Sequence, residues 1–127
     1  MRSMIYILFL ILVISACQNS SENQTANGTF ETISKTDFEK KLKEEADHIL
    51  VDVRTPSEYE AGTIGGAKNI NWNDVNFATE ISTLDKVKPI FIFCQKGGRS
   101  GEALKKMKGL GFREVYDLEG GYGGWRN

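Results

Sequence analysis

The residues best suited to chemistry in this 127-residue chain follow one cysteine, Cys94. Cys94 ends an apolar run, residues 89–94, and the loop after it consists of Gln95, Lys96, Gly97, Gly98, Arg99 and Ser100. The two glycines permit a tight loop, and a helix that begins near Arg99 would direct its N-terminal N–H groups at the sulfur. The two cations of the loop also favour a thiolate. We therefore predict an anion-binding cradle in which Cys94 is a nucleophile that attacks, carries a group and passes it on.

The alternative interpretation of Cys94 is an inert core residue, because free cysteine behaves as a small hydrophobic side chain and is often buried. A core cysteine does not need two glycines and two cations directly after it. The composition of the loop therefore favours the nucleophile over the inert residue.

The composition of the chain excludes several classes of function. Lysine and arginine number 16 against 17 acidic residues, which gives a formal net charge of -1. Such a chain has no broad basic surface, so we expect no nucleic-acid partner. The single histidine, His48, excludes a His-rich metal site. We predict neither a metal nor a cofactor.

Apolar runs typical of strands alternate with amphipathic segments typical of helices. A helix that begins after Thr55 has a capping box, with Pro56 in its first position and Glu58 in its third, and Gly62 ends it. We predict strands at residues 49–53, 67–70, 89–94 and 114–118, and further helices at 36–43, 75–84 and 99–108. The alternation predicts a single α/β domain with a mostly parallel sheet and helices on both faces. Cys94 would then lie at the carboxyl edge of the sheet, where such folds bind ligands.

The first seventeen residues have the layout of an export signal, with Arg2 before the apolar residues 5–14 and small residues after them. The apolar run is too short to cross a hydrocarbon core, which takes about 20 residues. Residues 14–17 (ISAC) resemble a bacterial lipobox, in which the cysteine is acylated and becomes the first residue of the mature protein. The alternatives are an ordinary signal peptide with an incidental cysteine, or an uncleaved anchor.

We therefore predict a signal peptide at residues 1–16, a lipidated Cys17 with a polar tether over 17–29, and one domain over 30–127. The protein would be lipid-anchored in a bacterial cell envelope and face the periplasm or, more generally, the extracytoplasmic side. Gln18, in place of an aspartate after the lipidated cysteine, favours the outer membrane where there are two. Cys94 would be the only free thiol, so a reductant must come from outside the chain.

Four segments resemble the motifs of the rhodanese family, in the family's order. Residues 94–100 resemble C-x-x-G-x-R-S, 51–59 resemble D-V-R-x-x-x-E-(aromatic), 62–67 resemble G-H-I-x-G-A, and 118–125 resemble L-x-G-G-(x)3-W. Together the four motifs span nearly all of residues 30–127, so the resemblance covers the whole predicted domain.

The resemblance implies a single-domain sulfurtransferase, which we expect to be a monomer. Cys94 would take a sulfane sulfur from a small-molecule donor such as thiosulfate and pass the persulfide sulfur to a thiophilic acceptor, cyanide or a thiol. Backbone amides from Gln95 to Arg99 would hold the persulfide, and the side chain of Arg99 would bind an anionic donor. The resemblance assigns substrate binding to residues 95–100, and an ion pair between Asp52 and Arg54 would brace the loop.

Three positions depart from the family pattern. Gln95 stands where members that prefer thiosulfate often have arginine, so thiosulfate turnover is expected to be weak. Thr63 replaces the usual histidine, a change expected to affect packing and not sulfur chemistry. Gly98 replaces a larger residue and is expected to leave the loop more mobile.

Two other functions are alternatives to sulfur transfer for a cysteine loop of this kind. Cell-cycle phosphatases of the related fold have five residues between cysteine and arginine, whereas four separate Cys94 from Arg99. The shorter ring is expected to be too small for a phosphate and to suit one sulfur atom. The remaining alternative is a non-catalytic rhodanese-like module that binds a partner or senses redox state through Cys94.

Overall fold

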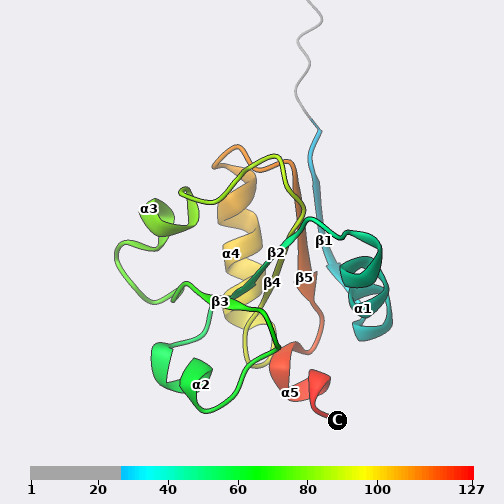
Figure 1. The fold of residues 1–127 in the computed structure, drawn as a ribbon. Coiled ribbons are helices and arrows are strands. Elements are labelled where there is room, and N and C mark those ends of the chain that lie inside the picture. Colours follow the sequence, from blue (N-terminus) through cyan, green and yellow to red (C-terminus); the bar gives the residue numbers. More distant parts are fainter. Residues whose placement is uncertain (1–26) are drawn as a thin grey trace, which may run out of the picture.

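The computed structural model describes residues 27–127, in which five strands alternate with five helices (Figure 1). The strands are β1 (Thr29–Ile33), β2 (Ile49–Asp52), β3 (Lys68–Asn69), β4 (Ile90–Phe93) and β5 (Glu114–Leu118). The helices are α1 (Lys35–Glu44), α2 (Pro56–Glu60), α3 (Phe77–Ile81), α4 (Gly98–Lys108) and α5 (Gly121–Trp125). The signal peptide, Cys17 and most of the predicted tether lie outside the described residues.

All five strands run parallel, in the order β1-β5-β4-β2-β3. The central strand β4 has four consecutive buried apolar residues, as expected of a parallel strand covered on both faces. Alternate side chains of the strands form two core clusters: one includes Ala103 and Met107 of α4, and the other includes Phe38 of α1. Helices therefore cover both faces of the sheet (Figure 1), and the predicted fold class is confirmed.

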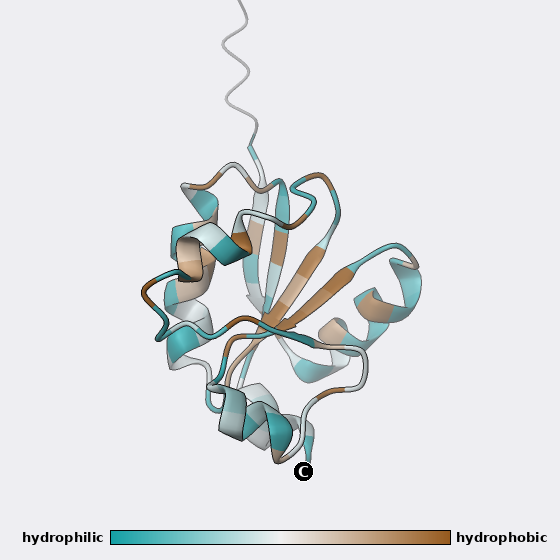
Figure 2. Cartoon of the chain, turned by 60° about the vertical axis from the view of Figure 1, so that its left-hand side comes forward, coloured by the Kyte–Doolittle hydropathy of each residue, from teal (hydrophilic) through white to brown (hydrophobic). Residues whose placement is uncertain are grey.

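The hydropathy of the chain follows this layered arrangement. Figure 2 shows the most apolar segments in the strands at the centre, while the helices carry hydrophilic residues toward the outside. No helix within residues 27–127 is long and apolar enough to cross a membrane. In the same part of the chain, no group of three or more His, Cys, Asp or Glu side chains is arranged to hold a metal ion.

Local sequence signals explain where two of the helices begin. Ser34 caps α1 by accepting a hydrogen bond from the Asp37 N–H at 3.2 Å. The capping box predicted at the start of α2 is present, since the Thr55 hydroxyl and the Glu58 carboxylate each accept a hydrogen bond from the other residue's backbone N–H.

The predicted helix over 75–84 is longer than the helix that forms, which is α3, Phe77–Ile81. Asn71 and Asp74 each accept a hydrogen bond from the N–H two residues further on, and such local turns compete with helix formation. The sequence pattern also misses β1, which includes Thr29, and α5, whose three glycines have low helix propensity.

Candidate active site

Cys94 lies directly after β4, at the carboxyl edge of the sheet, with 1% of its surface exposed. Its sulfur accepts hydrogen bonds from the Gly97 N–H at 3.0 Å and from the Ser100 hydroxyl at 3.3 Å. The chain turns back toward the sulfur because Gly97 has a φ of +110°, a backbone conformation that side-chain-bearing residues rarely adopt. Helix α4 begins at the next residue, so its N-terminus adjoins the thiol.

The environment of Cys94 favours the thiolate. Burial on its own raises the pKa of the thiol, because the charged form is desolvated. Hydrogen bonds from the Ser100 hydroxyl and from the backbone N–H groups of Ser100, Gly97 and Lys96 outweigh burial and hold the pKa below its usual range. This is the electrostatic arrangement of a reactive cysteine and not of an inert core cysteine.

A cavity of about 320 Å³ lies over the sulfur, lined by Cys94, Gln95, Lys96, Gly98 and Arg99. Five of the seven residues predicted for the site therefore line one cavity, and the other two, Gly97 and Ser100, hydrogen-bond the sulfur from within the loop. The cavity is large enough for a small ligand whose reacting atom contacts the sulfur.

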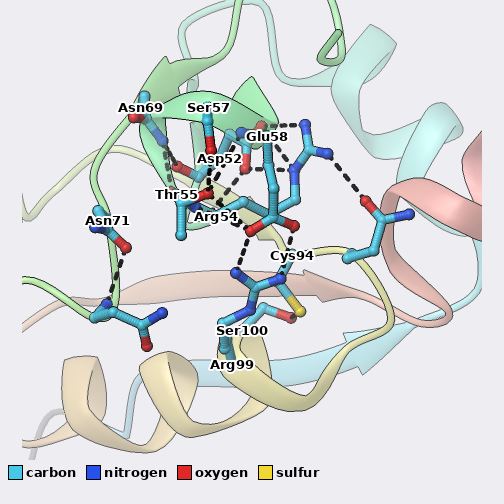
Figure 3. A network of polar contacts seen from close by, with 12 residues as sticks. Asp52, Arg54, Thr55, Ser57, Glu58, Asn69, Asn71, Cys94, Arg99 and Ser100 are labelled. Atoms are coloured by element: carbon cyan, nitrogen blue, oxygen red, sulfur yellow. Dashed lines mark hydrogen bonds and ion pairs between the residues drawn. The ribbon is translucent and has the colours of Figure 1, made fainter. Parts of the chain in front are cut away.

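Arg99 is held by a carboxylate that the sequence analysis assigned only to a helix cap. Its two terminal nitrogens, Nη1 and Nη2, donate to the Glu58 carboxylate at 2.6 and 3.0 Å (Figure 3). The hydrogen bond from Arg99 lowers the pKa of Glu58 to about 2, against the raising effect of burial and with the help of Thr55. The charge of Arg99 is thus largely compensated, although its remaining N–H groups can still reach an anion in the cavity.

Asp52 and Arg54 form a buried ion pair beside the loop, with an Nη2–Oδ2 distance of 2.7 Å (Figure 3). Arg54 also donates to the Gln95 side-chain oxygen at 3.0 Å and to the Gly62 carbonyl at 2.6 Å. The guanidinium therefore ties the turn after α2 to Gln95, the first residue after Cys94. Thr63 contributes to the same network by donating to Asp52 at 2.8 Å, so its contact is with the ion pair and not with the sulfur.

Helix α5 supports the cysteine loop through its backbone, a role the sequence analysis did not predict. The Tyr122 N–H donates to the Cys94 carbonyl at 2.8 Å, and the Gly123 N–H donates to the Gln95 carbonyl at 3.0 Å. Gly121 has a φ of +60°, and a Cβ there would lie 2.5 Å from the Cys94 carbonyl oxygen. The paired glycines at the start of α5, Gly120 and Gly121, were the available signal, since such a pair marks a close backbone approach.

Fold and site together define a class of protein. It is a parallel α/β domain that holds one cysteine in an anion-binding loop at the carboxyl edge of its central strand. The model of the rhodanese-like domain matches residues 34–127. The chain therefore belongs to the rhodanese family, as its four motifs indicated.

Relatives of known name are similar over about three fifths of the chain. Thiosulfate sulfurtransferase GlpE of Pseudomonas fluorescens is 36% identical over 78 residues, which cover 61% of this chain and 70% of that protein. Adenylyltransferase and sulfurtransferase UBA4 of Meyerozyma guilliermondii is 35% identical over 86 residues, or 63% of this chain. The chain spans only 20% of the length of UBA4.

Solved structures show the same fold. A rhodanese-related protein from Thermoplasma volcanium superposes with a TM-score of 0.66 at 27% identity, over 76% of this chain and 91% of that one. Nearly the whole of that protein therefore corresponds to the domain described here.

Proposed function

We propose that this domain is a sulfurtransferase in which Cys94 carries a sulfane sulfur as a persulfide. The observation that carries the proposal is the buried sulfur that accepts hydrogen bonds from Gly97 and Ser100 and has a lowered thiol pKa. Family membership and the sulfurtransferase names of GlpE and UBA4 support the reaction class.

The reaction consists of two displacements at sulfur. In the first, the Cys94 thiolate attacks the sulfane sulfur of a donor such as thiosulfate. A bond forms between the two sulfur atoms while the bond inside the donor breaks, and sulfite leaves with the electron pair. In the second, cyanide or a thiolate attacks the outer sulfur of the persulfide, and the Cys94 thiolate is the leaving group. No net oxidant or reductant is required.

The loop suits a monoanionic persulfide better than it suits a dianionic donor. The N–H and hydroxyl groups around the sulfur can hold one negative charge. Gln95 brings no charge to the cavity and Arg99 is paired with Glu58, so Lys96 is the one other cation in its lining. We therefore expect slow turnover with thiosulfate and faster turnover with a donor that carries less charge.

Intact-protein mass spectrometry of the chain, before and after incubation with thiosulfate, polysulfide or mercaptopyruvate, tests the proposal. We expect the mass to rise by one sulfur atom, the added sulfur to be removed by cyanide, and Cys94→Ser to show no gain. A wild-type protein that gains no sulfur from any of these donors would favour a binding or redox-sensing module instead.

We also propose that the domain is attached to the extracytoplasmic side of a bacterial envelope membrane by a lipid on Cys17. The support is sequence alone: an apolar segment too short to span a bilayer, followed at once by ISAC at residues 14–17. Cys17→Ala should release the protein into the soluble fraction. Unchanged membrane fractionation of this variant would contradict lipidation.

A further inference from the structure

Basic side chains gather at the end of the domain opposite Cys94. The chain has a formal net charge of -1, but residues 84–89 and 103–113 contain six basic side chains and only one acidic side chain, Asp85. We call these six residues the basic end: Lys86, Lys88, Lys105, Lys106, Lys108 and Arg113. The near-neutral charge of the whole chain therefore does not describe this part of it.

The topology of the sheet brings the basic end together. The strands are all parallel, so their first residues share one edge of the sheet. Lys88 lies two residues before β4, Arg113 lies directly before β5, and the lysines of α4 lie in its last turn. Cys94 follows β4 and therefore lies at the other edge. Figure 1 shows the last turn of α4 and the loop before β5 at one end of the domain, and α2 and α5 at the other.

The predicted tether joins the domain at this same end. Asn27, the first described residue, lines a cavity of about 380 Å³ together with Lys108 and Arg113. The Thr29 N–H also donates to the Arg113 carbonyl at 2.8 Å. Ten residue steps separate Asn27 from Cys17, so the two lie at most about 36 Å apart even in a fully extended chain. A lipid on Cys17 would therefore hold the basic end close to the membrane surface.

Exposed apolar side chains accompany the cations of the basic end. Within residues 27–127, two large apolar side chains are exposed: Val75, with 97% of its surface, and Val87, with 65%. Val87 stands between Lys86 and Lys88 in the sequence, and Val75 lines a surface cavity with Lys106. Basic and apolar side chains combined on one surface are typical of proteins that lie on anionic membranes.

Most of these cations can bind an external anion. Lys88 pairs with Asp47 at 2.9 Å and Lys105 pairs with Glu102 at 3.2 Å, but both pairs are solvent-exposed and therefore weak. The part of the chain that the structure describes provides no ion pair for three further exposed cations, Lys106, Lys108 and Arg113. These three can contact lipid phosphate groups without first losing an ion pair.

We propose that the basic end is a docking surface for anionic lipid headgroups, which holds the domain on the membrane with the Cys94 cavity turned toward the water. The inference rests on the proposed attachment to a membrane. Attachment converts docking into an intramolecular step, so a surface of modest affinity is sufficient. Each lysine or arginine near an anionic surface adds to the attraction, which falls off within a Debye length. Sulfur donors and acceptors would then reach Cys94 from the aqueous side and not from the bilayer.

Lysine acetylation of the full chain on vesicles tests the inference. The chain, purified in detergent, is inserted into preformed vesicles of phosphatidylcholine alone or of phosphatidylcholine and phosphatidylglycerol in equal amounts. A water-soluble acetylating reagent then labels the lysines, and mass spectrometry of peptides gives the rate for each. Lys96 beside Cys94 and Lys40 on α1 are exposed lysines outside the basic end and serve as internal controls.

We expect phosphatidylglycerol to slow the labelling of the lysines in the last turn of α4 about fivefold, the factor expected for one cation near an anionic surface. Lys40 and Lys96 should be labelled equally fast on both kinds of vesicle. Salt at about 1 M shortens the Debye length to about 3 Å and should abolish the protection. Alkylation of Cys94 by a charged, water-soluble reagent should be equally fast on both vesicles, because its cavity faces the water.

Two matched triple variants show whether the basic end itself is responsible. Neutralising the last turn of α4 should restore the labelling of Lys88 on phosphatidylglycerol vesicles, through the substitutions Lys105→Gln, Lys106→Gln and Lys108→Gln. The control has the same net charge and should keep Lys88 protected; its substitutions are Lys40→Gln, Lys43→Gln and Lys68→Gln. All six positions are exposed, so both variants should fold, and an unchanged rate of Cys94 alkylation in detergent solution verifies this.

Equal labelling of the α4 lysines on the two kinds of vesicle would overturn the inference. Protection that persists at Lys88 in the α4 triple variant, or that extends to Lys40 and Lys96, would also overturn it, because the protection would then not depend on the basic end. Protection in native envelope membranes but not on phosphatidylglycerol vesicles would assign this surface to a protein partner instead. Slower alkylation of Cys94 on phosphatidylglycerol vesicles would contradict the proposed orientation.

The test is independent of the other two proposals. Acetylation does not measure sulfur transfer, so an inactive Cys94 leaves its outcome unchanged. If Cys17→Ala stayed on the membrane, an uncleaved apolar segment would bring the same end of the domain to the surface, and the labelling comparison would apply as before. Lipidation and docking can therefore fail separately.

Discussion

Two groups of residues support the Cys94 loop, and they do so through different interactions. We call them the backbone wall and the ionic wall. The backbone wall consists of residues 120–123, in which the N–H groups of Tyr122 and Gly123 donate to the carbonyls of Cys94 and Gln95. The ionic wall consists of Asp52, Arg54, Glu58 and Arg99, which hold the opposite side of the loop through charged side chains. We infer that the two walls have different roles. Close packing of the backbone wall fixes the position of the sulfur, whereas the charged side chains of the ionic wall fix the orientation of the residues around it.

The largest effect is expected from breaking the buried part of the ionic wall. Arg54→Met keeps side-chain volume but leaves Asp52 buried without its partner, which typically costs about 3–5 kcal/mol. Chemical denaturation should show a loss of unfolding free energy of this size. Arg113→Met, at an exposed arginine, is the control and should lie close to the wild type. A loss of unfolding free energy below about 1 kcal/mol would mean that the Asp52–Arg54 pair contributes little to the stability of the ionic wall.

Disrupting the backbone wall should have a somewhat smaller effect on stability than Arg54→Met but a larger effect on the pKa of the Cys94 thiol. Gly121→Ala forces a side chain into left-handed backbone, and its Cβ meets the Cys94 carbonyl oxygen at 2.5 Å. The strain and overpacking should cost about 2–4 kcal/mol. We expect the thiol pKa, measured by alkylation, to rise because the loop must shift away from its donors.

Gly124→Ala is the matched control for that variant, since Gly124 has nothing within 4 Å of a new Cβ. It should leave both stability and alkylation near the wild type. If Arg54→Met moved the thiol pKa as far as Gly121→Ala does, the inference that the backbone wall alone positions the sulfur would be wrong.

The smallest effect concerns the exposed end of the ionic wall. Glu58→Gln retains a side chain that can close the capping box but removes the charge that pairs with Arg99. Both side chains are partly exposed, so solvent screening limits the stability change to about 1 kcal/mol near neutral pH. With Arg99 no longer compensated, the KM for thiosulfate should fall.

The difference in unfolding free energy between the wild type and Glu58→Gln should depend on pH. Its pH dependence is set by the pKa of Glu58, which is lowered from 4.5 to about 2. An acidic group whose pKa is lower in the folded protein than in the unfolded chain stabilises the fold at pH values above its unfolded pKa. That contribution to stability is lost as the pH falls through the folded pKa. The gap in unfolding free energy between the wild type and Glu58→Gln should therefore close between pH 4.5 and pH 2. Glu60→Gln, in the same helix and exposed, should show no such gap.

Sequence alone predicted the parts of the molecule whose signals are local. The β4 strand, the capping box before α2 and the glycines after Cys94 each depend on residues a few positions apart. The parts it missed depend on distant partners. Helix α5 is stabilised by carbonyls of the cysteine loop, and β1 by pairing with β5. The glycine pair at the start of α5 marks a close backbone approach but does not say to which segment.

The same reasoning applies to the site. The loop from Cys94 to Ser100 was recognisable because its residues are consecutive. The pairing of Arg99 with Glu58 joins positions 41 residues apart, and no local pattern in the sequence reveals it. Which charges remain available to a donor is therefore a property of the folded chain.

The pairing of β1 with β5 has a consequence for the order of folding. Thr29 pairs with Glu114, and Ile33 with Leu118, so the first strand of the domain is held by the last. Long-range parallel pairings of this kind form slowly, because a large loop must close before any hydrogen bond is gained. A chain truncated before Glu114 would lose the partner of β1 and one partner of β4 together, which leaves an edge of the central strand open to association with other chains.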